Sequence, residues 1–458
     1  MLALKKLKAA GRRTPITIFV EGDIFTKLSF VVWGLANMAR GQIVKGAIYL
    51  ALEAAYFYFL FTSGITNLAN MITLGTVEQG MVMDPAQGIL VMQPGDNSML
   101  MLLYGVVAIV VTAMAIVVWV TSIYSGEECR QLKLAGKKVP GILDDITSLF
   151  DTHIVRLFLC VPLIGILVFT VTPLIYMILM AFTNYDTDHQ PPGHLFSWVG
   201  LENFRAILDA SGKLGSTFLP ILGWTLIWAV VACASCYFGG MFLAILINSK
   251  GIRFKKMWRA IFILAMAIPA FVSLLVINTM LGQYGIINVL LQNWGFTTGP
   301  LPFLTNATWA RGTVIVVNLW LGFPSTMLMV SGILMNIPPE LYESASIDGA
   351  NPVQQFVSIT FPYMLQVTKP YLITNFIGNI NNFGVIYFLT AGAPSTLDYY
   401  KGAGKTDLLV TWLYKLTAES NDYNLAATIG ILIFVISAVF SMVTYAKAGI
   451  SQNEEALQ

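Results

Sequence analysis

Residues 99–123 read MLMLLYGVVAIVVTAMAIVVWVTSI, a run of 25 residues without a charged side chain. A helix needs about 20 consecutive apolar residues to cross the hydrocarbon core of a bilayer, whereas helices of a soluble core are apolar over shorter runs. Similar runs recur along the chain. The sequence therefore predicts an all-α, polytopic membrane bundle of about eight transmembrane helices, near residues 44–63, 99–123, 154–182, 218–248, 259–281, 313–335, 370–391 and 424–446.

The composition supports the same class of protein. Of the 458 residues, 56% are hydrophobic and only 11% are charged, and the mean hydropathy is +0.72. This leaves too little polar surface to cover a soluble protein of this size. The net charge of +2 is too small to indicate a nucleic-acid partner. An early apolar stretch, Ile24–Met38, contains Lys27 and is too short to span, so we expect it to lie along the membrane interface.

Basic residues in the loops predict the orientation, because short loops rich in Lys and Arg stay in the cytoplasm. The connection after the first predicted span, residues 65–98, contains neither Lys nor Arg. The amino-terminal arm is rich in both: Lys5, Lys6, Lys8, Arg12, Arg13, Lys27 and Arg40. An even number of spans then places both termini in the cytoplasm. The last outward loop opposes the rule, since it contains Lys401, Lys405 and Lys415.

The most informative segment is 338–362, PPELYESASIDGANPVQQFVSITFP, which this topology places in the cytoplasm. It predicts two short helices: prolines suit the opening turn, Gly349 suits a left-handed helix end, and Asn351 suits the N-cap of the second helix. We expect Pro362 to limit that second helix. Such a bent pair can project from the membrane into a groove of a partner, with Tyr342, Ala345 and Ile347 as apolar anchors. An ordinary amphipathic connector would show the same local features.

The segment also resembles the coupling loop of binding-protein-dependent ABC importer permeases, a loop with the pattern Glu-Ala-Ala, three residues, Gly, nine residues, Ile, one residue, Leu-Pro. Ser344 replaces the first Ala of that pattern and Phe361 replaces the Leu, both of them mild changes. The positions that carry the resemblance are Glu343, Ser344, Ala345, Gly349, Ile359 and Pro362. The resemblance implies a type I core of six helices whose loop docks on a cytoplasmic ATPase dimer. It also implies that the chain lies in the cell membrane of a prokaryote.

It also implies the other components of such a transporter. We find no nucleotide-binding motif in this chain, because Tyr399 stands where a phosphate-binding loop ending at Gly404-Lys405-Thr406 would need Gly. The chain itself is then a non-catalytic subunit without a cofactor, and ATP and Mg²⁺ are expected on the ATPase. A second homologous permease and an extracytoplasmic sugar-binding protein complete the expected partners.

Over residues 155–448 the chain is similar to the larger membrane subunit of maltose and maltodextrin importers. The stretches that carry this similarity are VGLENF at 199–204, NLWLG at 318–322, 379–383, and TDLLV at 406–410. The implied substrate is a malto-oligosaccharide. The chain would then divide into 1–150 (arm, interfacial helix and two additional spans), 151–217 (first core span and outward loop), 218–448 (importer core) and 449–458 (cytoplasmic tail).

Three asparagines in the seventh predicted span indicate the chemistry of the pathway. Asn375, Asn379 and Asn382 recur at i, i+4 and i+7, so we expect them on one helical face. Amides that face a cavity offer donors and acceptors to the hydroxyl groups of a neutral sugar. Alternatively, they join helices within the bundle.

The family resemblance favours the pathway. Its sugar-contacting positions match Asn318, Leu321, Gly322, Asn379 and Asn382. Four further positions differ from the best-known family pattern of Tyr, Ser, Tyr and Phe: Met266, Ala270, Ser325 and Gly378. The loss of aromatic side chains indicates a wider or less selective pathway, and an importer of a different oligosaccharide remains an alternative.

Other candidates for chemistry are few. Cys233 and Cys236 have a metal-type spacing but lie in an apolar run, where packing is the simpler interpretation, so no metal site is predicted. Glu53 is the one carboxylate deep within a predicted span, and it suits either a structural pairing or a coupling role. Pro269 and Pro324 interrupt spans, as simple kinks or as openings for the substrate. An ion-coupled sugar transporter is the second class of function, although it requires intramembrane charged groups that the chain lacks apart from Glu53.

Overall fold

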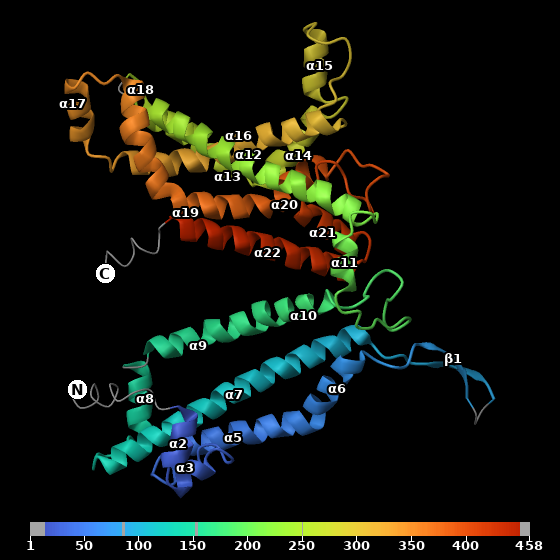
Figure 1. The fold of residues 1–458 in the computed structure, drawn as a ribbon, viewed down its shortest axis with the longest axis vertical. Coiled ribbons are helices and arrows are strands. Elements are labelled where there is room, and N and C mark those ends of the chain that lie inside the picture. The colour runs from blue at the N-terminus through green and yellow to red at the C-terminus, as the bar shows by residue number, and fades with distance from the viewer. Residues whose placement is uncertain (1–13, 85–87, 152–153, 250, 449–458) are drawn as a thin grey trace. The chain divides into compact units, whose positions relative to one another are not determined.

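The computed structural model describes residues 14–448 except 85–87, 152–153 and 250. The basic residues up to Arg13 and the tail 449–458 therefore lie outside the described residues. The chain divides into two compact units, Met1–Trp198 and Val199–Gln458. Both units are helical, and the first also contains a short two-stranded sheet (Figure 1).

The first unit is built around one long helix, α7, to which α5 and α6 pack. Its elements are α2 (Pro15–Glu21), α3 (Ile24–Leu28), α4 (Leu35–Met38), α5 (Ile43–Phe59), the π-helical turn η1 (Leu60–Gly64), α6 (Ile65–Thr73), β1 (Gly80–Met83), β2 (Leu90–Gln93), α7 (Ser98–Leu134), α8 (Ile142–Phe150), α9 (Ile154–Ile166), η2 (Leu167–Val171) and α10 (Thr172–Met180).

Two expectations for the amino-terminal region were wrong in detail. The stretch Ile24–Met38 is not one helix, because α3 and α4 are separated by turns and Gly34 adopts a left-handed conformation (φ +79°). A side chain at Gly34 would meet the carbonyl oxygen of Gly46 at 2.4 Å, so this glycine allows the turn to pack closely against α5. The first span is also longer than predicted, because helical structure continues from Ile43 to Thr73 through η1.

Glu53 has a structural partner in this region. Its Oε2 accepts a hydrogen bond from the backbone N–H of Trp33 at 2.8 Å, and the residue is buried. The carboxylate therefore satisfies a backbone donor that the turn between α3 and α4 would otherwise bury unpaired. This geometry supports the structural interpretation of Glu53.

The second unit contains the remaining helices. They are α11 (Glu202–Leu208), α12 (Gly215–Asn248), α13 (Lys255–Ala267), α14 (Ala270–Leu281), α15 (Ile286–Asn293), α16 (Ala307–Leu334), α17 (Pro339–Ile347), α18 (Pro352–Gln355), η3 (Phe356–Thr360), α19 (Phe361–Ile380), α20 (Phe383–Thr390), α21 (Leu409–Ala418) and α22 (Tyr423–Ala448). The long helices α12 and α16 form the most extensive contact in this unit.

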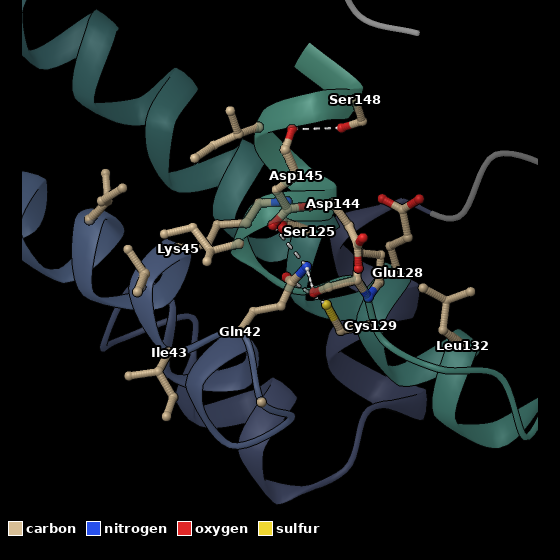
Figure 2. Close-up of a pocket in the computed structure, with 16 residues that line it drawn as sticks. Gln42, Ile43, Lys45, Ser125, Glu128, Cys129, Leu132, Asp144, Asp145 and Ser148 are labelled. Carbon is tan, nitrogen blue, oxygen red and sulfur yellow. Dashed lines mark hydrogen bonds between the residues drawn. The ribbon is translucent and has the colours of Figure 1, made fainter. Parts of the chain in front are cut away.

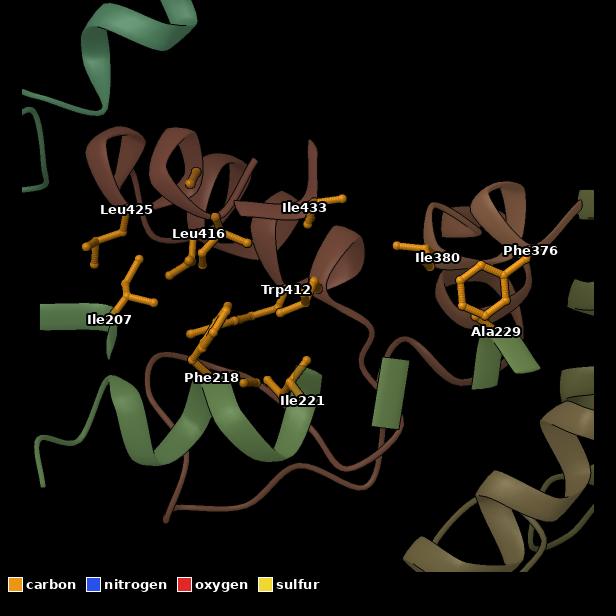
Figure 3. Packing of buried hydrophobic residues seen from close by; sticks show 14 of the residues in the cluster. Ile207, Phe218, Ile221, Ala229, Phe376, Ile380, Trp412, Leu416, Leu425 and Ile433 are labelled. Atoms are coloured by element: carbon orange, nitrogen blue, oxygen red, sulfur yellow. The ribbon is translucent and has the colours of Figure 1, made fainter. Parts of the chain in front are cut away.

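Its buried core lies where α12 packs against the carboxy-terminal helices. Figure 3 shows Phe218 and Ile221 of α12 facing Trp412, and Ala229 of α12 facing Phe376 of α19. Small residues bring α12 and α16 together: a side chain at Gly240 would meet Cβ of Thr326 at 2.6 Å. Close approach over glycine is the usual way in which membrane helices gain packing contacts, since lipid offers no hydrophobic driving force between them.

Seven helices among the described residues are long and apolar enough to cross a membrane: Ile43–Thr73, Ser98–Leu134, Phe158–Met180, Gly215–Asn248, Ala270–Asn293, Ala307–Leu334 and Tyr423–Lys447. The fold is thus the predicted polytopic helical bundle. The predicted span 259–281 is broken at Pro269 into α13 and α14, and the predicted span 370–391 is broken at 381–382 into α19 and α20. The predicted span 370–391 has no counterpart among these seven helices, whereas the predicted span 259–281 is represented by Ala270–Asn293.

Candidate functional site

The segment 338–360, which we call the elbow, forms the predicted pair of short helices. α17 ends at Ile347, and Gly349 just beyond it has a left-handed conformation (φ +82°). Ala350 N donates to Ala345 O at 2.9 Å, and Gly349 N donates to Ser346 O at 3.1 Å. This is the hydrogen-bond pattern of a Schellman helix end. Asn351 then caps α18: its Oδ1 accepts from Gln354 N at 2.9 Å, while Gln354 Oε1 accepts from Asn351 N at 2.8 Å.

Side chains brace the elbow from within. The hydroxyl groups of Tyr342 and Thr360 lie 2.8 Å apart, and Gln355 Nε2 donates to Ser346 Oγ at 2.9 Å. The predicted anchor Tyr342 is therefore engaged inside the elbow. The apolar side chains that face outward at the bend are Ile347, which is 86% exposed, and Val353, which is 70% exposed.

The predicted coupling residues occupy two parts of this segment. Glu343 and Ser344 are exposed on α17, Ala345 is half-buried beside them, and Gly349 is exposed at the bend. Ile359 lies in η3, the last turn of the elbow, and Pro362 lies in α19, the helix that leads away from it. The motif therefore marks both the elbow and the start of the helix to which it is joined.

Pro362 does not limit the second helix, which corrects the sequence prediction. Helical structure continues from Pro352 through η3 to Ile380. In η3 the backbone hydrogen bonds reach back five residues instead of four: Phe361 N donates to Phe356 O. Because the widened turn lies just before the proline, its missing N–H and its ring are accommodated without ending the helix.

A chain of uncharged polar groups follows one face of α19. Asn379 Nδ2 donates to Asn375 Oδ1 at 2.7 Å and to Asn375 O at 2.9 Å. Asn375 Nδ2 donates in turn to the Tyr371 hydroxyl at 2.9 Å. The Tyr371 hydroxyl lies 3.1 Å from Thr326 Oγ1 on α16. We call these four residues the polar chain; Tyr371 and Thr326 were not among the predicted site residues, although Tyr371 lies one turn before Asn375.

The direction of hydrogen bonding along the polar chain follows from its donors. The Tyr371 hydroxyl accepts from Asn375, so its own proton is free to donate to Thr326. Both hydrogen bonds donated by the Asn379 amide go to Asn375, so Asn379 Oδ1 is the acceptor that the polar chain does not use.

Asn382 does not lie on the same helical face as Asn375 and Asn379, contrary to the sequence prediction. α19 ends at Ile380, and Asn382 is the N-cap of α20, where its Oδ1 accepts from Val385 N at 3.3 Å. At the end of α19, Asn379 O accepts a hydrogen bond from Nε1 of Trp228, a residue of α12, at 3.1 Å. The two asparagines thus sit at a helix interruption, where Asn379 O also accepts from Asn382 N at 3.2 Å.

Asn318 and Gly322 of α16 lie against α12. Asn318 is 6% exposed and its Nδ2 lies 3.5 Å from Cys236 Sγ, while a side chain at Gly322 would meet the same sulfur at 2.6 Å. Leu321 packs on the cluster that contains Trp228. These three predicted residues therefore contribute to helix packing next to the break, and the sulfur of Cys236 serves that packing.

The four positions that differ from the family pattern share one property. Met266, Ala270, Ser325 and Gly378 are all exposed in this chain. A side chain added at Gly378 would meet nothing within 4 Å. Ser325 Oγ donates to Gly322 O within α16 at 2.8 Å.

Each basic residue of the last predicted outward loop contacts an acidic or aromatic side chain nearby. Lys415 Nζ lies 2.7 Å from Asp407 Oδ2 and both side chains are buried. Lys401 Nζ lies 2.7 Å from Asp422 Oδ1, and Lys405 Nζ stacks 3.9 Å from the ring centre of Tyr399. Asp407 also accepts from Gly404 N at 2.7 Å and from Thr411 Oγ1 at 2.9 Å. The segment 406–410 is therefore held to its neighbours by several buried polar contacts of Asp407.

A polytopic helical bundle in which an exposed pair of short helices continues into a long helix that ends at polar groups fits a membrane transport protein. Over residues 237–450 the chain matches the family model described as binding-protein-dependent transport system inner membrane component. The chain belongs to this family and is a multi-pass permease subunit of an ABC importer in the cell membrane.

Individual relatives match along most of the chain. The maltodextrin transport system permease protein of Bacillus subtilis (strain 168) is 33% identical over 436 residues, covering 93% of this chain and 96% of the relative. The galactooligosaccharides transport system permease protein of the same organism is 34% identical over 411 residues, covering 89% and 94%. The likeness thus extends well before residue 155, where the sequence-based resemblance began.

A solved structure supports the fold. A bacterial alginate ABC transporter, crystallised in complex with an alginate pentasaccharide-bound periplasmic protein, has a chain with a TM-score of 0.52 to this one. The identity is 23%, and the match covers 65% of this chain and 94% of that chain.

Proposed function

We propose that this chain forms one half of the translocation pathway of an importer for malto-oligosaccharides, with a second homologous permease as the other half. The observation that carries the proposal is the polar chain Thr326–Tyr371–Asn375–Asn379, which leads to a helix break without a charged group among its members. Hydroxyl and amide groups at such a break can exchange hydrogen bonds with a neutral sugar one hydroxyl at a time. The match to a maltodextrin permease over 93% of the chain supports this substrate class.

Coupling to ATP hydrolysis would take place at the elbow. A separate ATPase dimer carrying ATP and Mg²⁺ would receive Glu343, Ser344 and Ala345 of α17 in a surface cleft, with Ile347 and Val353 filling apolar space. Pro352–Ile380 is one continuous helical segment of 29 residues. At about 1.5 Å per residue, this segment is roughly 40 Å long and can act as a lever. A displacement of the elbow would then move Asn375 and Asn379 directly, and Gly349 would define the angle at which the lever leaves α17.

The supply of substrate would come from an extracytoplasmic sugar-binding protein that docks at the ends of the spans opposite the elbow. This arrangement places both termini in the cytoplasm, as the loop charges predict. The related alginate transporter was crystallised with a periplasmic protein carrying its oligosaccharide, which is consistent with delivery of this kind.

A galacto-oligosaccharide is the second candidate substrate, since a permease named for that substrate is 34% identical over 89% of the chain. Both sugars are neutral and rich in hydroxyl groups, so the polar chain suits either of them. The exposed small residues Ser325 and Gly378 allow for a bulkier or longer chain than an aromatic-lined pathway would.

The decisive experiment is ATPase stimulation in proteoliposomes that contain this chain with its co-expressed partner subunits. Maltose, longer maltodextrins and β-galacto-oligosaccharides are each supplied with the co-expressed binding protein. We expect stimulation by maltodextrins and little by β-galactosides. The reverse order would establish the second candidate, and sugar uptake driven by a proton gradient without ATP would contradict the coupling mechanism.

A further inference from the structure

The first unit contains a cavity of about 610 Å³ that the translocation mechanism does not use. Figure 2 shows its lining side chains, which come from the start of α5, the end of α7, and α8. Lys45, Glu128 and Asp144 contribute charged groups, and Ile43, Ile48 and Ile142 contribute apolar surface. The cavity is therefore amphipathic, with both kinds of surface accessible to one ligand.

Its position relative to the bilayer follows from the helices that form it. α5 begins at Ile43 and α7 ends at Leu134, and both belong to candidate membrane spans. α8 is amphipathic: it exposes Asp144 beside the apolar side chains Ile142, Leu143, Ile146 and Phe150. An amphipathic helix next to the ends of two spans lies at the membrane interface, whichever side of the membrane it faces. The cavity is thus at the depth of the lipid head groups.

The floor of the cavity is preformed. Gln42 is 6% exposed, and its Nε2 donates to Pro140 O at 3.2 Å and to Asp145 Oδ2 at 3.1 Å. Its Oε1 accepts from Asn37 Nδ2 at 2.8 Å and from Cys129 Sγ at 3.0 Å. These bonds connect α5, α7 and α8, so the cavity does not depend on a mobile side chain for its shape.

The charges around the cavity are available to a ligand. Within the described residues, no hydrogen bond or ion pair engages the Lys45 ammonium or the Glu128 carboxylate. Asp144 accepts from Gly141 N through Oδ2 at 3.0 Å, which leaves its charge without a cation. One ammonium and three carboxylates, counting Asp145, favour a ligand that carries both a phosphate and a primary amine over a ligand with a net negative charge.

We propose that this cavity binds the head group of an aminophospholipid of the phosphatidylethanolamine type. The phosphate pairs with Lys45, the ammonium donates to Glu128 and Asp144, and the acyl chains follow Ile43 and Ile48, which are 65% and 56% exposed. A lipid held in this way joins α8 to the ends of α5 and α7. This site is separate from the polar chain and does not rest on the proposed function.

The test measures retained lipid by native mass spectrometry on the full chain, purified with its partner subunits from membranes containing equal amounts of phosphatidylethanolamine, phosphatidylcholine and phosphatidylglycerol. We expect phosphatidylethanolamine to be retained about tenfold over phosphatidylglycerol, the ratio expected for one charge-assisted hydrogen bond. Lys45→Gln should weaken the retention of all three lipids, because they share the phosphate that Lys45 pairs with, whereas Glu128→Gln should remove most of the preference for phosphatidylethanolamine. Asp144→Asn should do the same while keeping the acceptor for Gly141 N.

Matched controls separate this site from general lipid binding. Lys133→Gln removes an exposed cation from the same end of α7, and Asp151→Asn removes an exposed carboxylate from the end of α8, both outside the cavity. Both should leave the preference unchanged. Equal retention of the three lipids, or equal loss in the controls, would overturn the proposal. Displacement of the lipid by soluble glycerophosphoethanolamine at equal concentration would also overturn it, because the ligand would then not need a membrane anchor.

Discussion

The side chain of Asn379 donates to Oδ1 of Asn375, one turn earlier on α19, over a distance of 2.7 Å. This bond fixes the orientation of an amide at a helix break and connects it through Tyr371 to Thr326 on the neighbouring helix. The orientation of the Asn379 amide is therefore determined by residues other than Asn379 itself. The first prediction tests this dependence.

Asn375→Leu should raise the apparent KM for sugar uptake by about tenfold while ATPase docking survives, because Asn379 loses the acceptor that orients its amide. Uptake and ATPase assays on the reconstituted complex measure both effects. Asn381→Leu is the matched control, since Asn381 is exposed at the same break and its Nδ2 donates only to its own helix, at Ile377 O. An equal rise in KM in the two variants would mean that sugar uptake depends on the helix break and not on the polar chain.

Gly349→Pro should leave the protein in the membrane but uncouple sugar uptake from ATP hydrolysis. Proline fixes φ near −65°, which is incompatible with the observed +82°. Gly349→Asn should retain most of the coupling, because Asn tolerates the left-handed conformation and a side chain at 349 would meet nothing within 4 Å. Full uptake by the Pro variant would contradict the role of the elbow.

Asp407→Asn should destabilise the second unit by about 3–5 kcal/mol, because it leaves the Lys415 ammonium buried without its counter-charge. Adding Lys415→Met should recover most of this loss, and thermal unfolding of the purified complex measures both changes. Lys405→Met is the control: it removes only a contact with the Tyr399 ring, worth about 0.5–1 kcal/mol. If Asp407→Asn had no larger effect than this control, the buried pair would not stabilise the loop.

Glu53→Gln should leave ATP-driven uptake unchanged, because a glutamine oxygen can still accept from Trp33 N. Glu53→Ala should lower stability by about 1–3 kcal/mol, since the buried N–H then loses its partner. Uptake at several external pH values, with and without a protonophore, provides the measurement. A strong effect of the Gln variant on uptake, with stability retained, would instead indicate that the carboxylate takes part in coupling.

Rules for helix ends predicted the elbow well and the seventh span poorly. The elbow depends on contacts between residues close in sequence, whereas the break in the seventh span depends on contacts with another helix. Gly349 and Asn351 act within a few residues of themselves, so their helix-end and helix-start roles were predictable and are confirmed. Pro362 was misjudged because the widened turn before it removes the usual steric conflict. Asn382 was misjudged because the break at 381–382 has no local signal as strong as proline, and contacts such as Trp228 Nε1 to Asn379 O stabilise it from another helix.

The sequence by itself determined that the chain is a polytopic membrane protein, and its 338–362 segment indicated the importer family to which the comparisons assign it. Both properties depend on the amino-acid composition and on the spacing of residues along the chain, which the sequence shows directly. Only the tertiary structure decided that Glu53 supports a turn, that Lys415 is paired with Asp407, and that the elbow continues into the helix of Asn375 and Asn379. Those outcomes depend on which donors and acceptors the packed helices bury together. In a medium without water each such group must find its partner within the protein, often far away along the chain.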